Sequence, residues 1–135
     1  MTIIKTTHFL KCSASWGDNM IEITVLNYLI SKNLTGINNN VYLEVPESPP
    51  AEYILVEKTG SGEMDRINQA MIAVQSISRT SLVTALGINE LVKTAMKEFP
   101  EESTEIYACK LNSDYNFTNT ETKEYRYQAV FNLYF

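Results

Sequence analysis

Apolar and polar positions alternate along the C-terminal end of the chain, with Val130 and Tyr134 as apolar exceptions on the polar side. One set of alternate positions consists of Tyr125, Tyr127, Ala129, Phe131, Leu133 and Phe135, and the other consists of Glu124, Arg126, Gln128, Val130, Asn132 and Tyr134. Successive side chains of a strand point to opposite faces, so this pattern predicts a long strand with one face on a core. Aromatic residues at this period are more often core than binding surface, and we interpret Tyr125, Tyr127 and Phe131 as core.

Two segments repeat their apolar positions at helical spacing. In residues 21–31 these positions are Ile21, Val25, Tyr28 and Leu29; in residues 81–99 they are Leu82, Ala85, Leu86, Ile88, Val92, Ala95, Met96 and Phe99. Each set forms a stripe along one side of a helix. Asp18 or Asn19 is placed to cap the first helix. Gly87 costs about 1 kcal/mol relative to Ala in a helix interior and Asn89 can cap a new turn, so a break is expected there. Pro100 is expected to end the second helix.

Shorter apolar, β-branched runs predict the other strands. They cover residues 41–45, 53–58, 67–77 and 105–111, and the prolines of PESPP separate the first two. The run at 67–77 alternates, with Ala70, Ile72 and Val74 on one side and a half-polar set on the other. Residues 59–65, TGSGEMD, have the composition of an exposed turn, and residues 112–122 have that of an extended loop.

The order of the elements predicts an α+β fold. A helix, three strands, a helix and two strands give a single domain with a mostly antiparallel sheet of about five strands and two main helices on one face. A chain of 135 residues has the length of one domain. Residues 1–19 show no sustained period, whereas Met20 begins a regular pattern, so we interpret 1–19 as a leader outside the fold and 20–135 as the domain. The alternative is a genuine N-terminal arm.

The composition argues against most chemistry. The net charge is −5 and no basic stripe is present, which disfavours nonspecific binding to nucleic acid. Cys12 and Cys109 lack metal or redox spacing, and the only histidine, His8, lies in the leader. Without histidine most general-base and nucleophile mechanisms are disfavoured. TGSGEMD matches neither phosphate-binding fingerprint. We therefore predict no catalytic residue, cofactor or metal.

No apolar run is long enough to span a membrane and no secretory signal is present, so we expect a cytoplasmic protein.

Two polar segments carry the candidate contact residues. They are Lys58, Ser61, Glu63, Asp65 and Arg66 in the first segment, and Asp114, Tyr115, Phe117, Glu121, Lys123 and Arg126 in the second. The first segment either grips a partner or is an ordinary hairpin tip. Tyr115 and Phe117 either insert into a neighbouring subunit or fold back on their own domain. The charged residues at 121–126 either lie on an ordinary solvated edge, or they determine which strand edge can pair with a neighbouring copy.

The same segments carry a family resemblance. LNSDYNFT followed by TKEYRYQAVFNL, together with EYILVEKTGSGEMDRINQAMIAVQSISRTSLVTA at 52–85, resembles the small head-tail joining or tail completion (tail terminator) proteins of long-tailed, non-contractile bacteriophages and prophages. The resemblance covers most of the chain after Met20. It implies a structural virion protein that assembles in the host cytoplasm and acts at the head-tail junction.

The resemblance also implies the partners. Copies of the chain would form a ring, commonly a hexamer, on the head-proximal end of the tail and stop the polymerisation of the tail tube. The major tail tube protein and the head connector or stopper protein would be its neighbours, with no membrane involved. DNA would pass through the ring without sequence-specific binding, and the acidity of the chain suggests a lumen that repels it.

Two other interpretations remain open at this stage. A small α+β enzyme or ligand-binding domain would use Asp65, Arg66, Asp114 or Glu121, since two carboxylates held in a cleft can perform acid-base chemistry. No spacing in the sequence selects such a pair. Another phage connector or minor capsid component is the second alternative.

Overall fold

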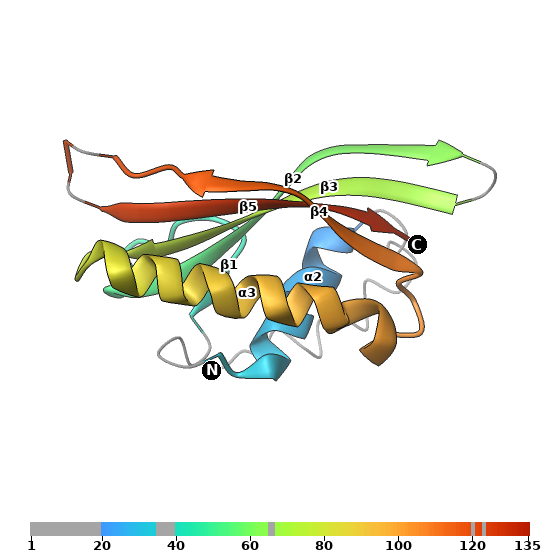
Figure 1. Cartoon of the computed structure of the whole chain (residues 1–135), viewed down its shortest axis with the longest axis horizontal. Coiled ribbons are helices and arrows are strands. Elements are labelled where there is room, and N and C mark those ends of the chain that lie inside the picture. Colours follow the sequence, from blue (N-terminus) through green and yellow to red (C-terminus); the bar gives the residue numbers. More distant parts are fainter. Residues whose placement is uncertain (1–19, 35–39, 65–66, 120, 123) are drawn as a thin grey trace.

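Two helices cover one face of a five-stranded sheet (Figure 1). The computed structural model describes residues 20–34, 40–64, 67–119, 121–122 and 124–135. The elements in chain order are α2 (Ile21–Lys32), β1 (Val41–Tyr42), β2 (Glu52–Met64), β3 (Ile67–Ser78), α3 (Leu82–Glu102), β4 (Ala108–Asn116) and β5 (Tyr125–Tyr134). The strand order is β1-β2-β3-β5-β4, and all neighbours are antiparallel except β1 and β2. The predicted fold class is confirmed. The interpretation of residues 1–19 as a leader lies outside the described residues.

The main core lies between the helices and the sheet. Tyr28 of α2 stacks on Phe99 of α3 with the ring centroids 4.0 Å apart, and its hydroxyl donates a hydrogen bond to the Ala95 carbonyl at 2.6 Å. The predicted stripe of α2 is buried throughout. On α3 the predicted stripe is buried except for Leu82 and Leu86, which are 37% and 39% exposed. The two helices therefore pack on each other as well as on the sheet.

The predicted alternation of the last strand is confirmed. Ala129, Phe131 and Leu133 are buried on the helix side of β5, which pairs with β3 on one edge and β4 on the other. Tyr125 and Tyr127 are half-buried, so they belong to the border of the core rather than to its interior. This end of β5 lies away from α2 (Figure 1).

The predicted boundaries of α3 are wrong in two places. No break occurs at Gly87, and Asn89 is fully buried within the helix rather than capping a new one. Pro100 also lies inside the helix, which continues to Glu102 because Met96 and Phe99 are anchored in the core and the Ser103 N–H bonds back to the Phe99 carbonyl at 3.0 Å. The N-terminus is capped by Ser81, whose hydroxyl accepts a hydrogen bond from the Thr84 N–H at 3.1 Å. For α2 the residue at the cap position is Met20, without a side-chain cap, and Asp18 and Asn19 lie outside the described residues.

The segment predicted as a turn at 59–65 is strand over most of its length, and the segment predicted as a loop at 112–122 is strand in its first part. TGSGEMD continues β2 as far as Met64, and residues 112–116 continue β4, whereas β1 is only two residues long and β4 begins at 108. Backbone pairing with a long partner explains this outcome, because residues 60–64 pair with 67–71 and residues 113–116 pair with 127–130. Each ladder satisfies backbone groups that a loop would leave to water.

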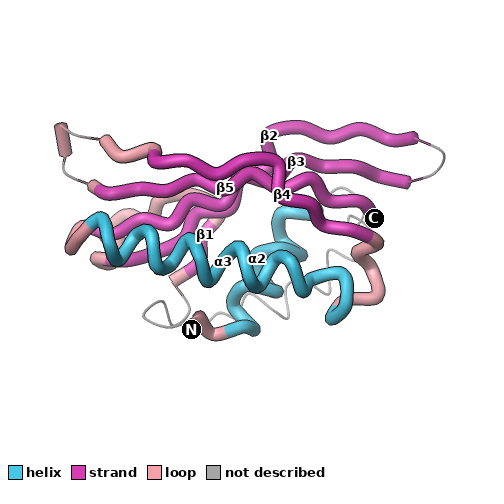
Figure 2. The backbone as a smooth tube through the Cα atoms, viewed as in Figure 1, coloured by secondary structure: helices cyan, strands magenta, loops and turns pink. Residues whose placement is uncertain are grey.

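The two hairpins project in opposite directions. Residues 59–64 and 67–71 form what we call the β2–β3 arm, which extends past the ends of both helices (Figure 2). The β4–β5 hairpin reaches its turn at the other end of the molecule (Figure 1). The face of the sheet opposite the helices, here called the helix-free face, runs between the two hairpins.

Candidate functional site

The β2–β3 arm holds the first group of candidate residues. Ser61 and Glu63 are exposed, and Lys58 is half-buried at the base of the arm. A bulge at Thr59 interrupts the ladder there, and the Thr59 hydroxyl donates to the Met71 carbonyl at 3.3 Å. Next to it, Lys58, Ser61 and Glu63 take part in lining a hollow of about 220 Å³. Asp65 and Arg66 lie outside the described residues.

Asp114 is held against the long helix. Its Oδ2 accepts hydrogen bonds from the Lys93 ammonium at 3.0 Å and from the Asn89 amide at 3.2 Å. A bulge between Leu111 and Ser113 shifts the alternation of β4 and thereby turns Asp114 to the helix side. Hydrogen bonds to Glu90 and then Asp114 raise the pKa of Lys93. Asp114 therefore connects α3 to the edge of the sheet.

Tyr115 and Phe117 lie together near the end of β4. Their rings meet edge to face with centroids 6.0 Å apart, and they are 42% and 49% exposed. The Tyr115 hydroxyl accepts a hydrogen bond from the Gln128 side chain. Tyr115 at the end of β4 and Phe117 just after it therefore both remain half open to solvent.

A polar network crosses the helix-free face. The Gln75 amide donates to the Gln128 carbonyl oxygen at 3.0 Å, and Arg126 donates to Gln75 at 2.9 Å and to Glu124 at 2.6 Å. The Tyr53 hydroxyl donates to the other oxygen of Glu124 at 3.3 Å. Burial, and then the charge of Glu124, raise the pKa of Tyr53. Arg126 is therefore held within the sheet surface, not solvated at an edge.

Below this network lies a second, small apolar cluster. Tyr53, Leu55 and Ile77 are buried on the helix-free face and Tyr42 packs against them. The predicted half-polar face of β3 is thus largely covered by neighbouring side chains, since Gln75 is only 8% exposed. The sequence analysis did not identify Gln75 and Gln128 as partners. The available signal was that each lies on the polar side of a strand whose apolar and polar residues alternate.

The turn of the β4–β5 hairpin carries the remaining candidates. The Glu121 N–H donates to the Asn119 side-chain oxygen at 3.0 Å, and Asn119 pairs with Glu124 in an isolated bridge. Lys123 lies outside the described residues. The structure therefore gathers Tyr115, Phe117 and Arg126 at one end, and it leaves Ser61 and Glu63 at the other (Figure 1).

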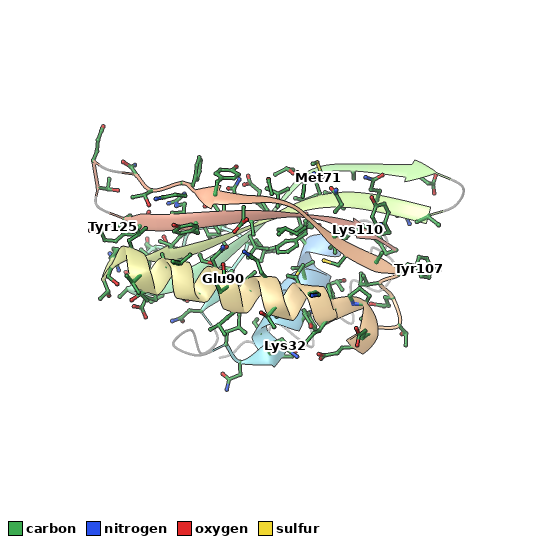
Figure 3. The ribbon with its side chains drawn as sticks, in the orientation of Figure 1. Lys32, Met71, Glu90, Tyr107, Lys110 and Tyr125 are labelled. Atoms are coloured by element: carbon green, nitrogen blue, oxygen red, sulfur yellow. The ribbon has the colours of Figure 1, made fainter. Side chains whose placement is uncertain are left out.

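A hollow of about 480 Å³ lies between α3 and β4. It is lined by Glu90, Lys93, Thr94, Lys97, Cys109, Leu111 and Phe131. Figure 3 shows Glu90 on the helix and Lys110 along the strand. Glu90 is the one carboxylate in this lining and forms an ion pair with Lys93 at 3.0 Å. Burial raises the pKa of the Cys109 thiol to about 12, which keeps it protonated and a poor nucleophile at neutral pH. The Lys93 ammonium binds both Glu90 and Asp114, so each of these carboxylates serves as an ion-pair partner of the lysine.

Within the described ranges, no three His, Cys, Asp or Glu side chains gather closely enough to hold a metal ion. The helices there also include none that is long and apolar enough to cross a membrane.

No protein-family model matches the chain, and no curated protein matches it either. Solved structures do match. One is a chain of the "Virion of native gene transfer agent (GTA) particle", which superposes with a TM-score of 0.54 at 15% sequence identity. The fold is shared with a virion chain. The likeness covers 72% of this chain and 78% of that one, so it includes most of both folds. At this level of identity the similarity concerns the fold.

Proposed function

We propose that this chain is a structural protein of a phage or prophage virion. In our proposal it acts as a tail terminator or head-tail joining protein: copies form a ring on the head-proximal end of the tail tube, stop its polymerisation and join tail to head. The fold shared with a chain of a gene transfer agent virion carries the proposal. The segments at 52–85 and 111–133, which resemble the terminator family in sequence, supply the specific role.

The form of the molecule is compatible with this role. A ring needs two different surfaces that meet between neighbouring copies, and it needs further surfaces for the tube and for the connector. The two hairpins at opposite ends supply separate surfaces (Figure 1), and the exposed Tyr115 and Phe117 lie in the β4–β5 hairpin. We assign the tube and connector contacts to the exposed parts of the β2–β3 arm and of the β4–β5 hairpin.

Disruption of the gene in the phage or prophage tests the function. Electron microscopy of the lysate should show filled heads without tails beside free tails of abnormal length. Complementation with the intact gene on a plasmid should restore infectious particles and is the control. Normal virions from the disrupted gene would overturn the proposal.

The same experiment separates the terminator from another virion role. A connector stopper or minor capsid component would leave tails of normal length that fail to attach, or heads that lose their DNA. A second measurement tests whether the protein forms a ring. The mass of the assembled protein in solution, with negative-stain images, should show closed particles of a single copy number, with six copies expected from the family resemblance.

A further inference from the structure

Both outer edges of the sheet leave a stretch of strand without a partner. Among the described residues, β1 pairs only with Ile54 and Leu55 of β2, so residues 56–64 have no neighbour on that side. At the other edge, eight of the nine residues of β4 have a strand partner, in each case on β5, and Asn112 lies in the bulge. Unpaired edges of this length attract further strands, and proteins normally protect them or use them.

The two free edges cover the same positions along the strand direction. The pairing runs in a continuous row from Gly62 through Gln69 and Tyr134 to Ala108. A second row runs from Gly60 through Met71 and Asn132 to Lys110. A neighbouring copy placed beside the sheet without a large shift along the strands would therefore align its free β2 edge with β4.

The strand directions agree with such a neighbour. Counting across the sheet, β2 and β5 run one way whereas β3 and β4 run the other. Rotation about a ring axis preserves each direction along that axis, so β4 of one copy would meet β2 of the next in an antiparallel pair. The helices of both copies would remain on the same side of the joined sheet.

The backbone groups also point the right way. The Ile54 N–H bonds to the Asn40 carbonyl on the β1 side, and Asn68 exchanges both backbone bonds with Phe135 on the β5 side. Hydrogen-bonded and non-bonded pairs alternate in antiparallel ladders, so Ser61 and Glu63 direct their N–H and C=O groups to the free edge. Asp114 directs its groups outward from β4 by the same alternation, because the Phe117 N–H bonds inward to Arg126. Leu111, on the other side of the bulge, also directs its groups outward, because its partner Phe131 bonds towards β3 as Phe135 does.

No contact within the chain requires glycine at two positions of the arm. A Cβ added to Gly60 or Gly62 would meet nothing within 4 Å, and neither residue has a left-handed φ. Glycine weakens a strand, and within strands it often marks a place where another backbone or side chain approaches closely. Both lie on the helix-free face of the arm, in the rows that would continue into Ala108 and Lys110 of a neighbour.

We propose that β2 of one copy pairs through its free edge, residues 56–62, with β4, residues 108–114, of the next copy. The proposal rests on the ring of the proposed function and specifies how its copies join. One sheet would pass from copy to copy around the ring, with the bare glycine backbone leaving room for the side chains on β4. Glu63 would then lie on the helix side, towards the groove lined by Lys93 and Lys97.

A matched pair of variants at Ser61 tests the edge pairing. S61P removes an N–H that no described strand uses, whereas S61A keeps it and loses only the exposed hydroxyl. We expect S61A to form rings as the wild type does and S61P to remain monomeric, with the same circular dichroism spectrum and melting temperature as S61A in the monomeric state. Rings formed equally by S61P would overturn the edge pairing and leave the terminator function standing.

Crosslinking in assembled particles tests the inference without relying on a variant that must fold. A photoreactive p-benzoylphenylalanine at position 61, irradiated in purified virions, should yield a dimer whose linked peptide contains residues 108–114. The same group at Glu101, exposed on α3, should give no link to that peptide. Links from position 61 only to another virion protein, or to a different part of the second copy, would overturn the proposal. Normal virions from the disrupted gene would instead overturn the proposed function.

Discussion

The Lys93 ammonium lies 3.0 Å from the Asp114 carboxylate and so ties the middle of α3 to the edge strand β4. The same carboxylate oxygen accepts a hydrogen bond from Asn89, which is fully buried. Lys93 and Asp114 are themselves partly exposed, with 25% and 29% of their side chains accessible, so solvent screens the ion pair. The contribution to stability therefore lies mainly in satisfying Asn89.

Replacement of Asp114 should consequently destabilise the fold more than replacement of a surface charge. D114A should lower the free energy of unfolding by about 1–3 kcal/mol, because the buried Asn89 amide loses its acceptor. Urea denaturation measures this. D114N keeps a side-chain oxygen and should lose less. E90A, which removes only the exposed partner of Lys93, should change stability by at most about 1 kcal/mol. Equal losses in D114A and E90A would contradict this assignment.

The network on the helix-free face predicts a second loss of stability. Q75A removes the partner of both Arg126 and Gln128 at a position that is only 8% exposed, and should cost about 1–3 kcal/mol. Thermal or urea unfolding checks the change. Q69A, on the same face of β3 but half-buried within the arm, is the control and should stay within about 0.5 kcal/mol. If the two variants unfold alike, the network contributes little.

Alkaline pH should destabilise the protein through Cys109. Burial raises the pKa of this thiol from 9.0 to about 12, so the unfolded chain releases the proton at a lower pH than the folded one. The stability is therefore fully present below pH 9 and falls as the pH rises from 9 to 12. The free energy of unfolding, measured across this pH range, should fall less steeply in C109A than in the wild type. Tyr28, whose pKa burial raises to about 12, should account for part of the remaining fall above pH 10. Identical pH profiles for C109A and wild type would refute the role of the thiol.

A small gain in stability is expected at Gly87. The residue is exposed in the interior of α3, and an added Cβ would meet nothing within 4 Å. G87A should raise the free energy of unfolding by about 0.5–1 kcal/mol, since alanine loses less backbone entropy in a helix. The melting temperature records the gain. Ring formation should be unchanged, because Gly87 is an exposed residue of α3 and belongs to neither free edge. A loss of stability would show that the helix requires glycine there.

The sequence predicted the elements whose pattern depends on burial. The alternation of β5 and the stripe of α2 appear in the structure as expected, because each buries one regular face against the core. The class of fold followed from their order. The end of α3 was predicted wrongly because Pro100 is a strong local signal, and tertiary packing of Phe99 outweighs it.

The candidate site was less accessible to prediction. Residues 59–64 and 112–116 have the composition of loops, but pairing with β3 and β5 decides their structure, and local composition does not contain that information. The position of Asp114 depends on the bulge after Leu111, since strict alternation from Cys109 would have put it on the opposite face. A one-residue insertion of this kind leaves no clear mark in a single sequence. Tyr115 and Phe117 are partly exposed, and whether they contact a neighbouring subunit stays a prediction.

The β2–β3 arm lies beyond the helices, and this location affects how the protein can evolve. Substitutions at residues 59–63 of the arm leave the main core between α2, α3 and the sheet untouched, so they have little effect on folding. Most substitutions in the core instead disturb close packing and destabilise the fold. Related chains can therefore diverge in the residues of the arm while keeping the same fold, and a new neighbour can be matched by changing a hairpin rather than the domain that carries it.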